Sequence, residues 1–476
     1  MDYGIELLEA RIAPATIKVV NLLDSGTGSL RDAISTAAVG DTIVFKSSLH
    51  GTIDLLSTLT VDKSLTIKGG GKIVLDYGNH SSLAIDDGNT GTLSNVTISG
   101  FTVQHVLDGW FDGENLTLKA CKFTNSFNGV NSGVISVASG GVLDVEGCTF
   151  SHISSDQVES ANGNAGVISS AGAVTIVNSK FTSNVAEGSG GAIVATSGSL
   201  TIKNSIFSKN NAWNTGGAIW ADGADSVSLT GVTFQGNNAL TSGAVDLQDV
   251  TTITVSGCHF LHNLAENQGA LYVNETTGSG GSVSIKNSTF TGNTAVQMNG
   301  ALALNLEVDL TATISHCVVT GNTAKTGSGG GMSLSTTSDG AAIDVVSTVI
   351  SGNRSGWSGA GLQVGSLSTV STITVSKCVI TGNSALTGDG GGIYLEGGVL
   401  EVSGSLVEGN KVQGSNNQGG GIYAGYGALT LSQSEVTGNQ AETGGGVLVA
   451  TSLGVIYTDG GGNTIKGNFG GNLSEQ

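Results

Sequence analysis

One short pattern recurs along most of this chain and limits what the chain can fold into. The pattern is an apolar residue followed three positions later by asparagine, as in Phe181 to Asn184 and Phe207 to Asn210. It occurs eleven times at intervals of 26 to 31 residues, and its asparagines are Asn184, Asn210, Asn237, Asn263, Asn293, Asn322, Asn353, Asn383, Asn410, Asn439 and Asn468. Internal repeats with a period of roughly 20–50 residues are the sequence signature of solenoids and related repeat architectures.

Each repeat also contains the pattern of short β-strands. Apolar residues alternate with other residues ahead of each asparagine, as in Val174 with Ile176 and Leu200 with Ile202. A period of two in β-branched and aliphatic residues predicts strands. One such unit cannot bury its apolar side alone, whereas stacked units bury it and bring equivalent positions into ladders. The chain is therefore predicted to be an all-β protein, a parallel β-helix.

The asparagines are expected to form one of these ladders. Side-chain amides stacked along an axis share hydrogen bonds from one coil to the next. Asparagine also tolerates the left-handed backbone conformation that ends a strand at a turn, and we expect it to serve that purpose here. Upstream, Phe123 and Phe150 fit the pattern, but Ser126 and Ile153 stand in place of the asparagine.

The upstream part is less regular, and it begins with a predicted helix. Counting the expected strands of the whole chain gives roughly 15–16 coils, which at ~4.8 Å per coil makes a rod about 75 Å long. Ser29 followed by Asp32 resembles a capping box and predicts a short helix that caps this end of the rod. We expect three parts: an export-associated, poorly ordered segment over 1–16, a cap with irregular coils over 17–120, and regular repeats over 121–476.

Composition argues against several functional classes. The chain has 18 Lys and Arg against 37 Asp and Glu, a net charge of −19, and its arginines are Arg11, Arg31 and Arg354. Nucleic acids and anionic membrane surfaces are bound mainly through Lys and Arg, so neither is an expected partner. No run of 18 apolar residues is present, so no transmembrane helix is expected. We expect a monomer.

Two motifs together give the chain a likeness to a known family. Phe181 to Asn184 with the segment Gly190–Ile193, and Phe207 to Asn210 with Gly216–Ile219, resemble the repeats of the chlamydial-type polymorphic outer membrane proteins. The resemblance covers about residues 120–470, although later repeats read Thr-Gly-Asn and Gly-Gly-Gly, a looser version. It implies a right-handed β-helix at the cell surface, of the kind that often serves as an adhesin-like autotransporter passenger.

The N-terminal part resembles exported proteins. The segment Leu8–Ala15 is similar to a short motif near the N-termini of secreted proteins from Planctomycetes and Verrucomicrobia. The segment Val19–Phe45 is similar to the first coil of many exported bacterial β-helix proteins. Both likenesses imply export, and neither names an activity. The expected location is therefore extracellular or on the outer surface of a Gram-negative-type bacterium.

All five cysteines fall at one position of the repeat. They lie two residues before the apolar ladder residue and are Cys121, Cys148, Cys258, Cys317 and Cys378. Serine holds the same position in other coils, for example Ser179 and Ser205, so the cysteines are expected to be structural thiols. Cys121 and Cys148 lie on adjacent coils at about the Cα distance that a disulfide tolerates, and whether they are bonded stays open at this point.

The sequence predicts no metal site and no cofactor. His259 and His262 are close together, but no cluster of His and Cys has the spacing of a zinc site. The segment Gly388–Gly391 is similar to part of a glycine-rich calcium repeat, yet the period and acidic spacing of that repeat are absent.

One strand of each coil carries a candidate carbohydrate-binding face. In the strand after the glycines, the first residue is expected to point inward and the next outward. The outward column reads Val194, Trp220, Asp246, Tyr272, Ala303, Ser333, Gln363, Tyr394, Tyr423 and Leu448. Trp220, Asp246 and Tyr272 follow one another on successive coils, and Asp249 and Glu275, three residues further along, are also neighbours. Aromatic rings flanked by carboxylates suit sugar binding, and two carboxylates about 5 Å apart also suit retaining glycoside hydrolysis.

A lyase would need a basic group beside acidic groups or a metal, and no such set of partners can be identified around Arg354. The favoured hypothesis is an exported, non-catalytic rod, structural or adhesin-like, with glycans or surface proteins as partners. The alternative is a carbohydrate-binding or polysaccharide-degrading protein, a lyase or glycoside hydrolase, that uses the face from Trp220 to Glu275. A convex face favours the rod, and a groove walled by loops favours the enzyme.

Overall fold

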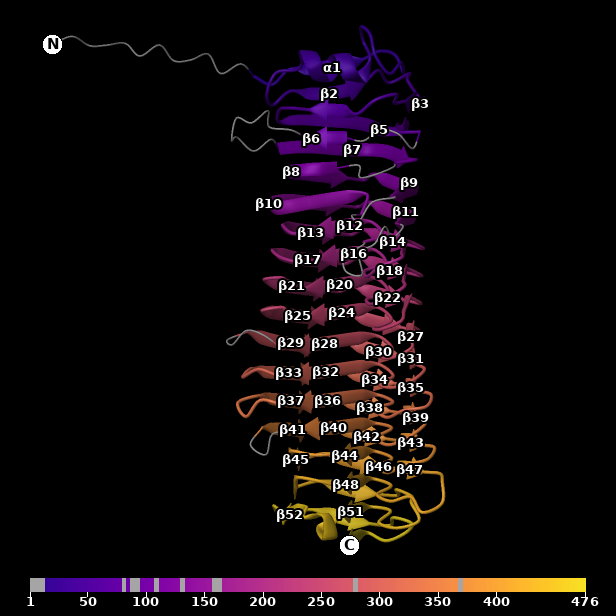
Figure 1. Cartoon of the computed structure of the whole chain (residues 1–476), viewed down its shortest axis with the longest axis vertical. Helices are drawn as coiled ribbons and strands as arrows, with labels where there is room; N and C mark the ends of the chain where they lie inside the picture. Colours follow the sequence, from indigo (N-terminus) through magenta and orange to yellow (C-terminus); the bar gives the residue numbers. More distant parts are fainter. Residues whose placement is uncertain are drawn as a thin grey trace, which may run out of the picture.

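The chain winds into a single stack of coils. A computed structural model describes residues 13–78, 83–85, 95–106, 111–128, 133–155, 165–276, 281–366 and 371–476. About 15 turns lie one on another along the long axis of the molecule, with α1 at the indigo end and the C-terminus at the yellow end (Figure 1). Strands of adjacent turns pair in parallel, so the predicted all-β parallel β-helix is confirmed. Residues 1–12 of the predicted export segment lie outside the described residues.

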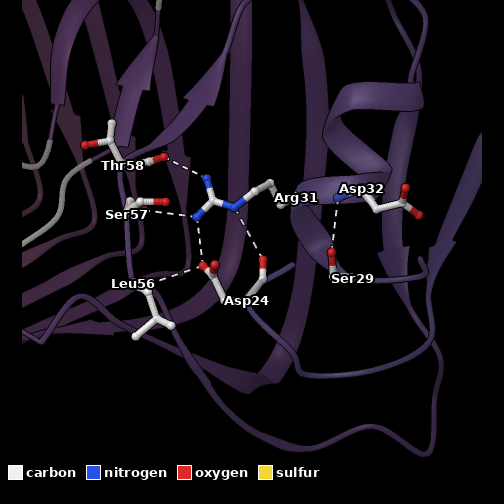
Figure 2. Close-up of polar contacts among 7 residues, drawn as sticks. All are labelled: Asp24, Ser29, Arg31, Asp32, Leu56, Ser57 and Thr58. Carbon is white, nitrogen blue, oxygen red and sulfur yellow. Dashed lines mark hydrogen bonds and ion pairs between the residues drawn. The ribbon is translucent and has the colours of Figure 1, made fainter. Parts of the chain in front are cut away.

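The N-terminal end is closed by the predicted helix, α1 (Leu30–Thr36). The hydroxyl of Ser29 accepts a hydrogen bond from the backbone N–H of Asp32 at 3.1 Å, which caps the helix (Figure 2). The Asp32 carboxylate accepts the N–H of Gly28 at 2.7 Å, one residue earlier than in a regular capping box. Leu30 and Ile34 are buried, so the apolar side of α1 covers the end of the core.

Arg31 joins this cap to the next loop. Its guanidinium contacts the Asp24 carboxylate at 2.8 Å and donates to the carbonyl oxygens of Ser57 at 3.0 Å and Thr58 at 2.7 Å (Figure 2). The planar guanidinium carries several donors in fixed directions, which suits it to hold a carboxylate and two carbonyls at once. The arginine therefore ties the segment before α1 to the loop that follows β3.

The first coils contain strands of uneven length. They are β1 (Thr16–Val19), β2 (Thr42–Phe45), β3 (Gly51–Asp54), β4 (Leu59–Val61), β5 (Leu65–Asp76), β6 (Leu83–Ile85), β7 (Asn95–Gln104), β8 (Phe111–Lys119), β9 (Lys122–Asn128), β10 (Ile135–Glu146) and β11 (Thr149–Ser155). The pairing of β5 with β7 and of β10 with β8 shifts register where the chain bends within a long strand. The long strands continue through these bends instead of ending at a turn. The sequence of this part therefore lacks the regular turn residues of the later repeats.

From residue 165 to residue 412 each coil has four strands, the next two coils have three, and strands pair with their equivalents in the adjacent coils. The first strands of the coils are β12 (Ile168–Ser170), β16 (Ile193–Ala195), β20 (Ile219–Asp222), β24 (Val245–Gln248), β28 (Leu271–Glu275), β32 (Leu302–Leu306), β36 (Met332–Thr336), β40 (Leu362–Ser366), β44 (Ile393–Leu395), β48 (Ile422–Ala424), β51 (Val447–Val449) and β54 (Leu473–Glu475). The second strands are β13 (Ala173–Val177), β17 (Ser199–Lys203), β21 (Ser226–Thr230), β25 (Thr252–Ser256), β29 (Ser282–Lys286), β33 (Thr311–Ser315), β37 (Ala342–Val346), β41 (Thr372–Ser376), β45 (Val399–Ser403), β49 (Ala428–Ser432) and β52 (Ile456–Asp459).

The third and fourth strands of each coil are shorter. The third strands are β14 (Lys180–Thr182), β18 (Ile206–Ser208), β22 (Thr233–Gln235), β26 (His259–Leu261), β30 (Thr289–Thr291), β34 (Val318–Thr320), β38 (Val349–Ser351), β42 (Val379–Thr381), β46 (Leu406–Glu408), β50 (Glu435–Thr437) and β53 (Thr464–Lys466). The fourth strands are β15 (Val185–Ala186), β19 (Asn211–Ala212), β23 (Asn238–Ala239), β27 (Leu264–Ala265), β31 (Thr294–Ala295), β35 (Thr323–Ala324), β39 (Arg354–Ser355), β43 (Ser384–Ala385) and β47 (Lys411–Val412). One 3-10 turn, η1 (Thr451–Leu453), lies in the last coil.

The phenylalanines of the repeat stack through the core. Their ring centroids lie 4.6 to 5.3 Å apart from one coil to the next, and the stack consists of Phe123, Phe150, Phe181, Phe207, Phe234, Phe260 and Phe290. All seven side chains are fully buried. Each ring is an apolar surface removed from water and packed against the ring above and below, which contributes to the main stabilising term of the fold.

The predicted asparagine ladder is present. Asn237 donates from its backbone N–H and its side-chain Nδ2 to the Oδ1 of Asn263, at 2.9 and 3.0 Å. Its Nδ2 also donates to the carbonyl of Phe207 at 3.0 Å. The same donations to the next coil's amide oxygen run from Asn184 to Asn468, and the first ten of the eleven asparagines are buried.

The left-handed residue of this turn is not the asparagine, as expected from the sequence, but the residue before it. Ser183, Lys209 and His262 have φ values of 55°, 55° and 52°, and Gly236 has a φ of 61°. The turn residue bends the chain, and the asparagine after it keeps a side-chain geometry that reaches both neighbouring coils. This arrangement explains the Thr-Gly-Asn of later repeats, because glycine adopts a positive φ without steric penalty.

The cysteine column forms a second ladder. The Cys121 N–H donates to the Sγ of Cys148 at 3.3 Å, and the Cys148 N–H donates to the hydroxyl of Ser179 at 3.1 Å. All five cysteines are free and buried, so Cys121 and Cys148 are thiols here rather than a disulfide. Burial raises the pKa of Cys258 and Cys317 to about 11, which disfavours the reactive thiolate. The position selects a small side chain that accepts a backbone N–H from the preceding coil.

Candidate functional site

The predicted face has the register expected from the sequence. Trp220 on β20 pairs with Asp246 on β24, and Asp246 pairs with Tyr272 on β28. Val194 precedes them on β16. All four side chains lie outside the main core, as the alternation of inward and outward residues requires. The position of the column agrees with the sequence prediction, but the side chains in it differ in their exposure to solvent.

The expectation that Trp220 and Asp246 face solvent is wrong. Trp220 is only 7% exposed and packs with Val194 and Ala165 in a small cluster outside the main core. Asp246 is fully buried, and its carboxylate accepts hydrogen bonds from Thr215, from Ser242 at 2.7 Å and from the side-chain amide of Gln248 at 2.9 Å. Thr215 and Ser242 belong to the turns before β20 and β24, so these turns fold back over the outward column.

Glu275 does not share the face of Tyr272. It is 2% exposed and lies at the end of the buried series that begins with Leu271 and Val273, because an offset of three residues reverses the direction of a strand side chain. Its carboxylate accepts the N–H of Val250 at 3.2 Å. In a regular parallel strand pair, a backbone carbonyl oxygen of the next coil would accept this N–H. Burial, and then the charge of Asp249, raise the pKa of Glu275 to about 8.

Asp249 is the bend residue that creates this arrangement. Its φ is 50°, and its carboxylate accepts hydrogen bonds from the backbone N–H of Thr276 at 2.7 Å and from the hydroxyl of Thr276 at 2.9 Å. Asp249 and Glu275 are neighbours on adjacent coils, as expected, but they belong to a turn and not to an open platform. Of the five candidate residues, Asp249 and Tyr272 are half-buried, and of these two Tyr272 belongs to the outward column.

A second outward column runs beside the first. Its members pair in register from coil to coil and are Asp222, Gln248, Asn274, Asn305 and Ser335. The Asn305 amide donates to the Oδ1 of Asn274 at 2.8 Å and to the Glu307 carboxylate at 2.9 Å. This side of the first strands is therefore polar, and its amides are held in fixed directions by one another.

Further toward the C-terminus the first column becomes accessible. Gln363 on β40, Tyr394 on β44 and Tyr423 on β48 pair in register. The rings of the two tyrosines stack with centroids 5.5 Å apart and planes 5° apart. Tyr426, 52% exposed, follows β48. We name Gln363, Tyr394, Glu396, Tyr423 and Tyr426 the tyrosine face.

Two carboxyl groups bear on the tyrosine face, Glu396 as a member of it and Asp389 as a neighbouring charge. Glu396 is exposed and accepts a hydrogen bond from the Gln363 amide at 2.8 Å. Asp389 accepts the backbone N–H of Gln418 at 2.8 Å, and burial raises its pKa. Burial first, and then the charge of Glu396, raise the pKa of Tyr394 to about 12, so its phenol stays protonated at neutral pH. The face presents neutral hydroxyl and amide groups beside negative charge.

A hollow of about 320 Å³ adjoins the tyrosine face through Gln363. It is lined by Met298, Thr326, Gly327, Ser328, Trp357 and Gln363. Trp357 is 59% exposed and lies in the turn before β40. Sequence reasoning placed Tyr394 and Tyr423 in the outward column but weighed only the coils from Trp220 to Tyr272. The signal that would have found the tyrosine face is the pair of identical aromatic residues on adjacent coils.

The described residues hold no group of three or more His, Cys, Asp and Glu side chains placed to bind a metal ion. Within the same part of the chain, none of the helices has the length and apolar character needed to cross a membrane.

Comparison with known families agrees with the geometry. Residues 165–344 match the model of a right handed beta helix region, so the coils are right-handed as the sequence resemblance implied. Residues 377–396 match the repeat of Chlamydia polymorphic membrane proteins, which confirms the predicted resemblance. Together these matches support a surface β-helix protein. No curated protein matches the chain.

Three solved structures match most of the length of the chain, each at low similarity. The A-module of a mannuronan C-5 epimerase from Azotobacter vinelandii is 13% identical over 94% of this chain and 100% of its own, with a TM-score of 0.25. A mannuronic acid specific polysaccharide family 6 lyase from human gut microbiota is 12% identical over 88% and 87%, with a TM-score of 0.27. A family 6 alginate lyase is 12% identical over 97% and 100%, with a TM-score of 0.17. TM-scores this low carry no inference about activity.

Proposed function

We propose that this protein is an exported, non-catalytic rod at an outer bacterial surface, where it acts in structure or adhesion. The observation that supports this most is the pair of overlapping buried ladders: stacked phenylalanines join the coils from Phe123 to Phe290, and asparagines join the coils from Asn184 to Asn468. Because each repeat is fixed to its neighbours, such a rod holds its outward side chains at a constant spacing over its whole length.

The burial of two candidate carboxyl groups, Asp246 and Glu275, supports the non-catalytic part of the proposal. Asp246 is held by three donors from its own turns and strand, and Glu275 accepts a backbone N–H in the core. A general acid or base has to reach the substrate within hydrogen-bond distance. Carboxylates that are occupied in this way stabilise the coil and do not reach a substrate.

The proposal also covers the location of the protein and the division of the chain into three parts. The polymorphic membrane protein repeat supports an outer-surface location, and the motif over Leu8–Ala15 supports export. We propose the segment 1–16 as export-associated, 17–120 as the cap with irregular coils, and 121–476 as the regular rod. Glycans or surface proteins are the proposed partners of a monomeric rod.

An adhesion assay tests the proposal. Microspheres coated with the purified chain are expected to attach to intact cells in larger numbers than microspheres coated with the heat-unfolded chain, because only the folded rod presents its outward columns. Antibodies against the chain are expected to label unpermeabilised cells that express it. Equal attachment of folded and unfolded coats, or labelling only after permeabilisation, would contradict the proposal.

A second candidate, a polysaccharide lyase or glycoside hydrolase, is favoured by one observation. Glu275, whose pKa is raised to about 8, lies beside a second carboxyl group, Asp249, and a carboxyl group that keeps its proton near neutral pH is what a general acid requires. Products released from a panel of polysaccharides by the wild type, but not by Glu275→Gln, would support it. No released product from any polysaccharide would reject it.

A further inference from the structure

We propose that the tyrosine face and the hollow beside Trp357 bind a neutral, linear polysaccharide laid along the rod axis. This inference rests on the proposed surface function, since such a partner is met outside the cell. It names a ligand class and a set of residues, and its test is separate from the adhesion assay.

The tyrosines repeat at the spacing of the coils. Tyr394 and Tyr423 occupy the same position on adjacent coils, with ring centroids 5.5 Å apart. Tyr426, two residues beyond the end of β48 and 52% exposed, adds a third tyrosine close to Tyr423 in the chain. Groups that recur once per coil suit a ligand that also recurs, and a linear polysaccharide repeats one ring unit along its length.

Polar groups capable of contacting sugar hydroxyls surround these rings. Among the described residues, neither phenol hydroxyl of Tyr394 and Tyr423 has a hydrogen-bond partner. The Gln363 amide donates to Glu396 at 2.8 Å, and both side chains retain further donor or acceptor capacity. A small number of fixed polar groups on an apolar surface is the usual composition of a specific ligand site.

The hollow continues the tyrosine face onto an exposed indole. Gln363 lines the hollow of about 320 Å³ and is also the register neighbour of Tyr394. Trp357 and Met298, 59% and 45% exposed, lie two coils apart on the same hollow, and the turn with Thr326, Gly327 and Ser328 lies between them. An exposed indole presents a large, rigid apolar surface with a polar N–H, and a sugar ring with its C–H groups on one face can pack on it.

The strands under the site favour a glycan over an extended peptide. β40 pairs with both β36 and β44, and β48 pairs with both β44 and β51. A peptide that adds as a β-strand needs an unpaired strand edge, and these strands have none along the rod. The site therefore has only side chains to offer, which is how a polysaccharide with many hydroxyl groups is recognised.

Charge selects a neutral ligand. The negative charges of Glu396 and Asp389 contribute to the raised pKa of the Tyr394 phenol, and the chain as a whole carries a net charge of −19. An anionic polysaccharide such as a polyuronate would approach like charge, which opposes association. Neutral hexose or N-acetylhexosamine polymers have no such penalty, and their hydroxyl groups can donate to Glu396.

Calorimetric titration of the folded full chain with hexasaccharides tests the proposal. The probes are oligosaccharides of cellulose, mannan and chitin, with oligogalacturonate of the same length as the anionic comparator. At least one neutral hexasaccharide is expected to bind more tightly than oligogalacturonate. Trp357→Ala is expected to weaken that binding about tenfold, the effect of one lost aromatic contact. The double variant Tyr394→Ala with Tyr423→Ala is expected to weaken it further.

Trp213→Ala is the matched control. Trp213 is 57% exposed, close to the 59% of Trp357, but it lines a different hollow with Leu240 and Leu264, away from the tyrosines. Its removal is expected to leave glycan binding unchanged. Circular dichroism of each variant confirms that the rod is folded, since these side chains lie outside the main core.

Three outcomes would overturn the proposal. These are no binding of any neutral hexasaccharide, equal or tighter binding of oligogalacturonate, and a Trp357→Ala variant that binds as the wild type does. If coated microspheres still attach to cells and protease treatment of the cells abolishes attachment while periodate treatment does not, the partner is a protein. In that case the glycan inference fails and the proposed surface function stands.

Discussion

The asparagine ladder concentrates several hydrogen bonds on one small side chain. Replacing Asn237 with alanine leaves the N–H and Nδ2 of Asn210 without their acceptor and the Phe207 carbonyl without its donor. Because these groups are buried, we expect Asn237→Ala to lower the free energy of unfolding by about 1–3 kcal/mol. Denaturant-induced unfolding measures this loss.

The next residue supplies the control for the ladder. Asn238 is exposed, and its side-chain amide donates to the Oδ1 of the half-buried Asn211 at 2.7 Å. Asn238→Ala is expected to change the free energy of unfolding by no more than about 0.5 kcal/mol. Equal losses from the two variants would show that the ladder does not stabilise the rod.

Trp220 is a packing residue although it lies outside the main core. It fills a small cluster with Val194 and Ala165 beneath a turn. We expect Trp220→Ala to lower the free energy of unfolding by about 3 kcal/mol, as for other buried tryptophans. Trp213→Ala, at an exposed position, should leave it within about 0.5 kcal/mol. A wild-type melting temperature for Trp220→Ala would show that the turn does not cover the ring.

Glu275 is expected to make stability depend on pH. Burial raises its pKa from 4.5 to about 8, so the folded chain keeps a proton that the unfolded chain releases. Its stabilising contribution is complete below pH 4.5 and is lost as the pH rises through 8. Glu275→Gln removes this titration, so the difference in melting temperature between variant and wild type should increase from pH 5 to pH 8. Parallel curves would contradict the prediction.

At the scale of the elements, glycines set how closely successive coils approach. A Cβ on Gly217 would collide with the carbonyl oxygen of Gly243 and with the backbone of Asn238. Gly236 has a φ of 61°, but the nearest atom to its added Cβ is the Cγ of Lys209 at 4.0 Å. The two glycines therefore serve different purposes, close approach at one and backbone conformation at the other.

This difference predicts unequal effects of alanine. Gly217→Ala is expected to lower the free energy of unfolding by about 3 kcal/mol, because the coils have to separate. Gly236→Ala is expected to lower it by about 1 kcal/mol, the strain of a left-handed residue that Lys209 and Ser183 already bear at equivalent positions. Denaturant-induced unfolding of the pair tests the distinction, and similar losses would contradict it.

The register of the elements could be predicted from sequence, and the direction of particular side chains could not in every case. The repeated glycines and asparagines align the coils, so Trp220, Asp246 and Tyr272 were placed on neighbouring strands correctly. Glu275 was expected beside the outward Tyr272. It lies three residues after Tyr272 on β28, and an odd offset within a strand directs the side chain to the opposite face. The burial of Trp220 depends on turns that fold back over β20 and β24, and no strand periodicity describes their path.

At the scale of the whole molecule, the two ends differ. At one end α1 covers the core with Leu30 and Ile34. At the other, the inward residues Tyr457 and Ile465 are only half-buried, and among the described strands β52, β53 and β54 pair on one side only. Stability in a solenoid is a sum of contacts between neighbouring repeats, so a coil with one neighbour opens more readily.

Hydrogen exchange tests this asymmetry. The amides of β52 to β54 are expected to exchange faster than those of β20 to β28, which are paired on both sides. Mass spectrometry of peptic fragments from the native chain gives the comparison. Uniform protection along the rod would show that the coils open together rather than from the C-terminal end.

The sequence by itself determined the coil, its period, the ladders and the N-terminal cap. It could do so because each repeat presents the same residues at the same positions, and stacking is the one arrangement that buries the apolar side of every repeat. Only the tertiary structure decided which outward residues meet solvent. Trp220 and Tyr394 share one column, yet the first is covered and the second is half-buried beside an open hollow. Exposure depends on how the turns of one coil lie across its neighbours, and no local period encodes that path.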